Sequence, residues 1–258
     1  MIGGRSSYGA FASVYDHLMS DMPYDDWIAW LEAYWQAHER PSNIVDLGCG
    51  TGTIAIPLAQ SGLNVTGIDL SQEMITVARE KEAAFRKEVQ IPGKLTWLQG
   101  DVREWRTAEP FDAAVSLCDC LNYLLTEDEL LQAFRRTYDG LAPGGCFLFD
   151  MHHANQLDEY MMHEPFCHDD ELVSYLWNCE LNEQTSTITH HLVFFLPEED
   201  GRYKRVEETH RERAYSEETI RRLLTEAGFT RIEPSADFTF EPIDEDSTLR
   251  MFFAATRP

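Results

Sequence analysis

The glycine-rich segment at residues 48–52 constrains the fold of this chain more than any other part of the sequence. Residues 43–47 form a short apolar and β-branched run just before it, and a helical pattern follows it to about residue 60. A buried strand that passes through glycines into a helix is typical of a parallel sheet. Glycines let the backbone turn sharply and let a ligand approach it closely. The segment therefore favours an α/β fold with a ligand site at this turn.

Strands and helices alternate through the first 150 residues. Further strands are predicted at residues 64–68, 95–99, 112–117 and 146–150, and helices at 10–39 with a break at Pro23, at 72–87 and at 127–139. Ser71 is the predicted N-cap of one helix, and Thr126 with Glu129 forms a capping box for another. Crossovers of this kind place parallel strands side by side, with helices on both faces of the sheet.

After residue 150 the pattern changes to long segments of alternating character. They lie at residues 171–182, 185–196 and 203–215, with turns at 183–184 and 200–201, which is typical of an antiparallel meander. A helix at 216–227, closed by Gly228, and strands at 230–237 and 248–256 then return to the first sheet. The predicted fold is a doubly wound α/β domain with a seven-stranded, mostly parallel sheet and an inserted antiparallel β meander.

The chain is strongly acidic. It has 45 Asp and Glu against 21 Lys and Arg, a formal net charge of −24. Such a charge repels phosphate backbones and anionic lipid, so nucleic acid is an unlikely partner. No apolar run approaches the ~20 residues needed to span a bilayer, and residues 1–10 lack the features of a secretory signal, so a cytoplasmic location is expected. The six cysteines include no Cys-x-x-Cys pair, which favours reduced thiols over disulfides or a zinc ribbon.

Three acidic residues stand near the ends of predicted strands. Asp46 lies before the first glycine, Asp69 follows the second strand 23 residues later, and Asp101 follows the third. A carboxylate at the position of Asp69 is suited to accept hydrogen bonds from both hydroxyls of a ribose. An acid ahead of the glycines would attract a cationic or hydroxylated ligand and would be unhelpful beside a pyrophosphate.

The segment Asp46-Leu47-Gly48-Cys49-Gly50-Thr51-Gly52 resembles the first motif of the class I S-adenosylmethionine-dependent methyltransferases, acid-x-Gly-x-Gly-x-Gly. The resemblance covers residues 8–150 and implies S-adenosylmethionine as the cofactor. It implies that Asp46 and the three glycines hold the methionine portion, that Asp69 holds the ribose, and that Asp101 meets the adenine amino group, with Val102 beside the ring. It also assigns to cofactor binding Tyr15, Cys49, Leu70, Met74 and Leu117.

Two further segments resemble a bacterial subgroup of small-molecule-type methyltransferases whose substrates are mostly unassigned. They are Asn122-Tyr123, after the fourth strand, and the opening Tyr8-x-x-Phe11-Ala12-x-x-Tyr15-Asp16. A dinucleotide oxidoreductase is the nearest rival, but its Gly-x-Gly-x-x-Gly fingerprint needs a glycine at position 53, where Thr53 stands. A purely structural alternative is that the glycines only make a tight turn.

The chain is expected to divide into three regions. Residues 1–40 are expected to form N-terminal helices that cover the cofactor, residues 41–150 and 216–258 to bind it, and residues 151–215 to form a β-rich lid. Because side chains alternate along a strand, one face of the lid can pack on the core while the other lines an acceptor pocket. The alternative use of the lid is contact with a second copy of the chain in a homodimer.

The predicted activity is in-line transfer of a methyl group from S-adenosylmethionine to a small-molecule acceptor of unknown identity. Such a displacement depends chiefly on positioning, and a base is needed only where the acceptor must lose a proton. His152, His153 and Tyr123 are the candidates for that base. Residues 118–123 lack the paired prolines of nucleic-acid amine methyltransferases. The alternatives are a non-catalytic module that binds S-adenosylmethionine or S-adenosylhomocysteine, and a tRNA methyltransferase.

Several potential metal ligands gather in the inserted region. They are His163, Cys167, His168, Asp169, His190 and His191. Their spacing matches no metal-binding template, so no metal is predicted.

Overall fold

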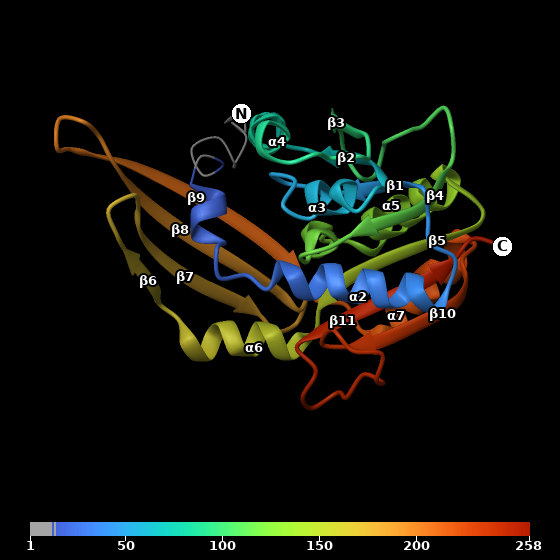
Figure 1. The fold of residues 1–258 in the computed structure, drawn as a ribbon. Helices are drawn as coiled ribbons and strands as arrows, with labels where there is room; N and C mark the ends of the chain where they lie inside the picture. The colour runs from blue at the N-terminus through green and yellow to red at the C-terminus, as the bar shows by residue number, and fades with distance from the viewer. Residues whose placement is uncertain (1–11, 13) are drawn as a thin grey trace.

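The computed structural model describes residue 12 and residues 14–258 and contains two sheets (Figure 1). The first has seven strands in the order β10-β11-β5-β4-β1-β2-β3. They are β1 (Asn43–Leu47), β2 (Asn64–Asp69), β3 (Leu95–Gln99), β4 (Phe111–Ser116), β5 (Leu141–His152), β10 (Thr230–Ala236) and β11 (Arg250–Thr256). Strands β1 to β5 pair in parallel, whereas β11 is antiparallel to both β5 and β10. The predicted seven-stranded, mostly parallel sheet is confirmed.

Helices cover both faces of this sheet. They are α2 (Tyr24–Ala37), α3 (Ala55–Gln60) and α4 (Gln72–Glu88), and on the opposite face α5 (Glu127–Gly140) and α7 (Glu217–Ala227). Adjacent residues of β5 show the alternation, because Leu148 packs in the first core while Phe147 and Phe149 pack in the second. The caps agree with the sequence: Ser71 accepts from the Met74 N–H, and Thr126 and Glu129 form a capping box.

The second sheet is antiparallel, in the order β6-β7-β8-β9. Its strands are β6 (Phe166–Asp169), β7 (Ser174–Asn182), β8 (Thr187–Pro197) and β9 (Tyr203–Arg213). Three strands were predicted here, and the prediction that a strand begins at 171 is wrong. Asp170 instead accepts hydrogen bonds from the N–H groups of Leu172 and Val173, which makes a turn between β6 and β7. Two further elements were not predicted: β6, which has only four residues, and α6 (Ala154–His163), which His153 caps.

The N-terminal helical segment is shorter than predicted. Of the predicted helix 10–39, the described residues form α1 (Tyr15–Leu18), a turn, and then α2, which Pro23 precedes. Proline favours the start of a helix and disfavours helical backbone in the residue before it. Tyr8 and Phe11 of the opening motif lie outside the described residues.

Figure 1 shows the second sheet extending from one side of the first, with α1 against one of its faces and α6 along its base. The contacts at both places are apolar. Phe194 of β8 packs with Met74 of α4 and with the partly buried Leu18 of α1. At the other end, Leu157 of α6 packs with Cys179 and Ile188. Among the described residues, no helix is both long enough and apolar enough to span a bilayer.

Candidate functional site

The glycine turn after β1 is built around left-handed backbone. Gly48, Gly50 and Gly52 have φ of 79°, 53° and 77°. A Cβ on Gly48 would lie 2.1 Å from Cys120 Sγ, and one on Gly52 would lie 2.5 Å from Trp97 Cη2, whereas a Cβ on Gly50 would meet nothing within 4 Å. Gly48 and Gly52 are therefore required by packing, and Gly50 faces open space.

A small pocket of about 40 Å³ lies over this turn. It is lined by Tyr15, Tyr24, Asp46, Gly48, Cys49, Gly50, Thr51, Thr53, Ile54, Leu117 and Cys118. The pocket thus brings together six residues predicted from the sequence: Tyr15, Asp46, Gly48, Cys49, Gly50 and Leu117. Gly52, Asp69, Leu70, Met74, Asp101 and Val102 lie outside its lining; Leu70 is 64% exposed and Met74 is buried against α1.

Helix α1 is tied down over the pocket by Asp16. The Asp16 carboxylate accepts from Thr51 Oγ1 at 2.5 Å and from Lys81 Nζ at 2.6 Å. The neighbouring His17 lies 2.6 Å from Asp170, so α1 also contacts the second sheet. Ligand pockets usually enclose at least about 300 Å³, so this arrangement is a closed one that must widen to admit a cofactor.

Asp46 is a buried carboxyl group with no hydrogen-bond partner among the described residues; its side chain is 3% exposed. Burial, with a smaller contribution from the nearby Asp69, raises the pKa of Asp46 to about 7. Asp69 differs because its two oxygens accept hydrogen bonds from the N–H groups of Gly50 and Ser71, both at 2.8 Å. Burial still raises the pKa of Asp69, although these two hydrogen bonds oppose the shift. The pocket therefore holds a carboxyl group that a cationic ligand would ionise and pair with.

Asp101 is held by a neighbouring cation. Arg103 donates to both oxygens of Asp101, at 2.9 and 2.6 Å, and also contacts Glu129. The hydrogen bond from Arg103 lowers the pKa of Asp101. Val102 is partly buried against the second core. Any ligand that uses the Asp101 carboxylate must therefore share it with Arg103.

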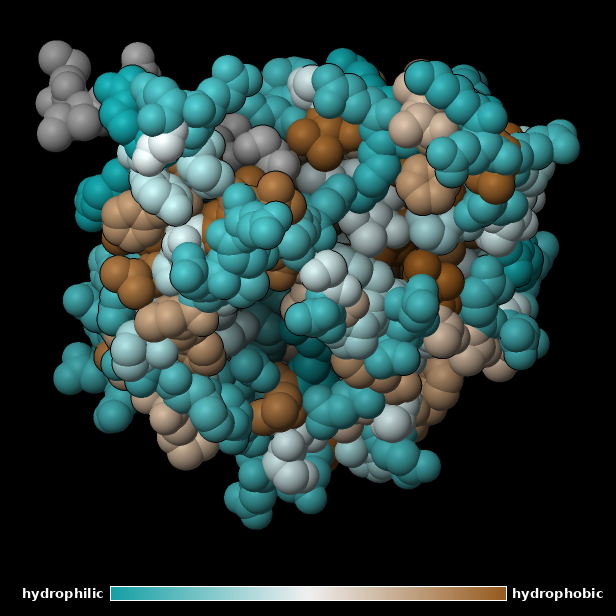
Figure 2. All heavy atoms as spheres, turned by 60° about the vertical axis from the view of Figure 1, so that its left-hand side comes forward, coloured by the Kyte–Doolittle hydropathy of each residue, from teal (hydrophilic) through white to brown (hydrophobic). Residues whose placement is uncertain are grey.

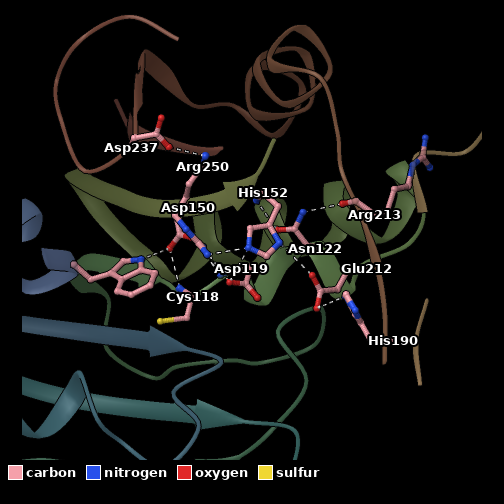
Figure 3. A network of polar contacts seen from close by, with 11 residues as sticks. Cys118, Asp119, Asn122, Asp150, His152, His190, Glu212, Arg213, Asp237 and Arg250 are labelled. Carbon is pink, nitrogen blue, oxygen red and sulfur yellow. Dashed lines mark hydrogen bonds and ion pairs between the residues drawn. The ribbon is translucent and has the colours of Figure 1, made fainter. Parts of the chain in front are cut away.

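Beside the pocket lies a polar network centred on Asp150, at the end of β5 (Figure 3). Asp150 is fully buried and accepts from Trp27 Nε1 at 2.9 Å, from the Cys118 and Asp119 N–H groups at 2.8 and 3.1 Å, and from Arg250. Cys118 and Asp119 both have left-handed φ, of 58° and 54°. Because such backbone is strained in residues with a Cβ, the Asp150 carboxylate holds a conformation that the chain would otherwise leave.

Hydrogen-bond donors fix the tautomers of two buried histidines in this network. Arg250 Nη2 lies 2.8 Å from His152 Nε2, and a guanidinium can only donate, so Nε2 accepts and the proton of a neutral ring sits on Nδ1. Likewise Trp177 Nε1 donates to His190 Nδ1 at 3.1 Å, which leaves the His190 proton on Nε2. Burial lowers the pKa of His190, while Glu212 opposes this. Both N–H groups face Glu212, at 3.3 Å for His152 and 3.7 Å for His190.

Each of the three residues predicted as candidate bases makes another polar contact in the structure. The lone pair of His152 is occupied by Arg250. His153 caps α6 by accepting from the Asn155 N–H and lies 3.5 Å from Glu245. The Tyr123 hydroxyl lies 3.4 Å from His210 Nδ1.

Several residues of the network were not predicted as site residues. They are Asp119, Asp150, Glu212 and Arg250, while His190 was considered only as a potential metal ligand. One signal was present in the sequence, because Glu208, His210 and Glu212 occupy every second position of β9 and so share one face of the strand. The structure buries all three residues, which is unusual for charged side chains.

Two groups of three described residues are spaced closely enough to hold a metal ion, Asp119 with His152 and Glu212, and His17 with His168 and Asp170. In the first group, the Arg250 hydrogen bond occupies His152 Nε2, so binding a metal there would displace a buried guanidinium. Of the predicted cluster of ligands, only His168 belongs to either group.

Comparisons with known proteins show the family to which this chain belongs. A family model described as a methyltransferase domain matches residues 44–145. A protein of Geobacillus sp. (strain WCH70) named as a methyltransferase is 38% identical over 253 residues, which cover 97% of this chain and 100% of that protein. The crystal structure of an S-adenosylmethionine-dependent methyltransferase from Clostridium acetobutylicum ATCC 824 superposes with a TM-score of 0.82 at 26% identity, covering 97% of this chain and 99% of that one. The chain is a class I S-adenosylmethionine-dependent methyltransferase.

A third relative of this methyltransferase is more distant. It is the dTDP-3-amino-3,4,6-trideoxy-alpha-D-glucopyranose N,N-dimethyltransferase of Streptomyces venezuelae, 34% identical over 109 residues, which cover 42% of each chain. The family confirms the enzyme class and S-adenosylmethionine as the cofactor of the methyltransferase. It also excludes the dinucleotide oxidoreductase that the glycine spacing had disfavoured.

A matched set of alanine variants separates the two uses of glycine in the methyltransferase. Gly50→Ala and Gly201→Ala both force left-handed backbone without a clash, so each should lower the free energy of unfolding by about 1 to 2 kcal/mol. Gly48→Ala should lower the free energy of unfolding by about 1 to 3 kcal/mol more than these two variants, because its Cβ would clash with Cys120. Only Gly50→Ala, among the two milder variants, should weaken S-adenosylhomocysteine binding. Urea denaturation and calorimetry measure both effects, and equal affinities for Gly50→Ala and Gly201→Ala would contradict the assignment.

Proposed function

We propose that this methyltransferase acts on a small-molecule acceptor that reaches the methyl donor beside Cys118 and Asp119, beneath the second sheet. The observation that carries the proposal is a shared boundary: Cys118 lines the pocket over the glycine turn, and Asp119 belongs to the polar network. In open α/β sheets, ligands bind outside the carboxyl ends of the strands, and β4 and β5 both end here. Figure 2 views the side of the molecule on which the second sheet lies, and its surface is hollowed near the centre among hydrophilic residues.

In this proposal Asp46 pairs with the ammonium group of the cofactor. An ammonium ion would supply the charge that the buried Asp46 carboxyl group lacks, and the glycine turn lets the cofactor approach the backbone. Asp69 accepts from the ribose hydroxyls with the lone pairs that Gly50 and Ser71 leave free. The adenine ring lies toward Asp101 and Val102. Leu70 and Met74 take part only if the cofactor site widens toward them.

Residues 1–40 act as a cover and residues 151–215 as a lid. Support comes from Tyr15, which lines the pocket, and from Asp16, which joins α1 to Lys81 and Thr51. Apolar packing between α1, α4 and the second sheet would let the cover and the lid close together. Small-molecule specificity agrees with the amino-sugar acceptor named for the Streptomyces venezuelae relative, and with the net charge of −24, which disfavours nucleic acid. We place the enzyme in the cytoplasm.

Transfer of a labelled methyl group tests this function. The enzyme is incubated with S-adenosylmethionine labelled in its methyl group and with either a low-mass cell extract or total tRNA. We expect label in low-mass products and none in tRNA. Label in tRNA alone would support a tRNA methyltransferase. S-Adenosylhomocysteine binding without transfer to either pool would support the non-catalytic module.

A further inference from the structure

The polar network beside the pocket carries excess negative charge. Asp119, Asp150 and Glu212 contribute three carboxylates, and Arg250 is the one arginine or lysine that contacts them among residues 14–258. Arg213 follows Glu212 in the sequence, but its side chain points away from the network (Figure 3). The Arg213 guanidinium lies over the Tyr215 ring. A ligand that carries or develops positive charge would be stabilised here.

The same network offers no free imidazole base. His152 and His190 each accept a hydrogen bond on one nitrogen and present an N–H to Glu212 with the other. Glu212 is only 5% exposed, and neither its Oε2 nor His152 Nδ1 has a hydrogen-bond partner within the described chain, because the 3.3 Å contact between them is poorly aligned. Glu212 Oε2 is therefore an acceptor that a further hydrogen-bond donor can fill.

Asp119 is the network residue nearest in sequence to the cofactor pocket, directly after Cys118. Its Oδ1 contacts Arg250 at 3.0 Å and His152 at 3.3 Å. Its Oδ2 accepts no hydrogen bond from any described residue, and the side chain is 19% exposed. Burial acts to raise the pKa of Asp119, but the charge and hydrogen bond of Arg250 outweigh it and lower the pKa, so the group is a carboxylate and a weak base.

We propose that the acceptor is a basic amine, and that Asp119 and Glu212 bind its N–H groups beside the methyl donor; this inference rests on the proposed function. The amine gives any extra proton to water, and its lone pair then attacks the methyl carbon. The N–C bond forms as the C–S bond breaks, and the electron pair of that bond passes to sulfur to give S-adenosylhomocysteine. Positive charge develops on nitrogen in the transition state, where the two carboxylates stabilise it. The product leaves as the methylammonium ion or loses its proton to water.

Other acceptor classes fit this network less well. A carboxylate acceptor would be repelled by the three acids. An alcohol or phenol becomes a good nucleophile only when a base removes its proton, and the two histidines have no free nitrogen while Asp119 is too weak a base. An amine needs no such base, because its neutral form already carries a nucleophilic lone pair.

The first test identifies the chemical class of the labelled product. A low-mass cell extract is divided, and the amines in one half are acylated with an N-hydroxysuccinimide ester before hydroxylamine removes any O-acyl groups. We expect acylation to remove nearly all transfer of label, and the product of the untreated half to bind a cation exchanger and to survive alkali. Full transfer to the acylated extract, or an alkali-labile or neutral product, would overturn this inference while the proposed function stands.

The second test measures charge-neutral variants with the amine fraction of the untreated extract as the acceptor. Asp119→Asn should lower kcat/KM for the amine fraction by about 100-fold, and Glu212→Gln should raise KM, while both retain wild-type affinity for S-adenosylhomocysteine. Glu207→Gln is the matched control, because Glu207 lies on the same strand, 64% exposed, and turns away from the network. If Asp119→Asn fails to fold, Glu212→Gln carries the test.

Each outcome of the second test decides one question. Wild-type kinetics in both Asp119→Asn and Glu212→Gln would overturn the roles proposed for the two carboxylates. Equal losses in Glu207→Gln would do the same, since the effect would then come from net charge alone. No transfer of label from any extract, with S-adenosylhomocysteine bound, would overturn the proposed function and this inference with it.

Discussion

Replacing Asp46 with asparagine should stabilise the unliganded enzyme above neutral pH and weaken cofactor binding. The pKa of Asp46 is raised from 3.8 to about 7 in the folded chain. As pH rises between these values, the unfolded chain releases this proton and the folded chain retains it, so stability falls with pH until the folded group ionises. The Asp46→Asn substitution removes that loss, and the gain should reach about 2 to 4 kcal/mol at pH 8 and be smaller at pH 5.

The same Asp46→Asn substitution should weaken cofactor binding, because the ammonium group of the cofactor loses its ionic partner. Affinity for S-adenosylhomocysteine should fall by about 1.5 to 3 kcal/mol, which is roughly 10- to 150-fold. In the wild type, affinity should strengthen as pH rises through about 7, because the carboxylate form is the one that binds. Urea denaturation and calorimetry at both pH values measure these effects, with the exposed Glu199→Gln as the control. A stability gain that does not depend on pH would contradict the buried, partly protonated Asp46.

Removing the Asp150 carboxylate should destabilise the protein strongly. Asp150→Ala leaves the Trp27 indole and two backbone N–H groups without their acceptor in a fully buried site, and it removes one of the two carboxylates that pair with Arg250. Breaking a buried ion pair by deleting one partner costs about 3 to 5 kcal/mol of unfolding free energy. Cofactor binding should weaken too, because the left-handed backbone at Cys118 and Asp119 loses its support.

Urea denaturation of three variants checks the size and origin of this effect. Trp27→Phe deletes a single donor and should lose only about 1 kcal/mol from hydrogen bonding. Asp237→Asn is the matched control, because its carboxylate accepts from the N–H groups of Leu249 and Arg250 at the protein surface. If Asp150→Ala unfolds within about 1 kcal/mol of the wild type, the network does not hold this edge of the sheet.

The fold could be predicted because its signals are local. The run at 43–47 and the glycines after it specify a strand, a left-handed turn and a helix within a few residues, and Thr126 and Glu129 cap a helix through their own backbone. The prediction failed where local signals are short: α1 has four residues, β6 has four, and Asp170 makes a turn where alternation predicted a strand. In such segments a few tertiary contacts outweigh local propensity.

By itself, the sequence determined the alternating pattern, the glycine turn and the acid that precedes it. Only the tertiary structure decided what the buried polar groups do. Arg250 meets Asp150 across 100 positions of the chain and Asp119 across 131, and no period in the sequence marks these pairs. The role of His152 is set by the same guanidinium, which occupies the nitrogen that a base would need. Local backbone preferences fix elements over a few residues, whereas the partner of a buried charge depends on which strand ends the completed sheet brings together.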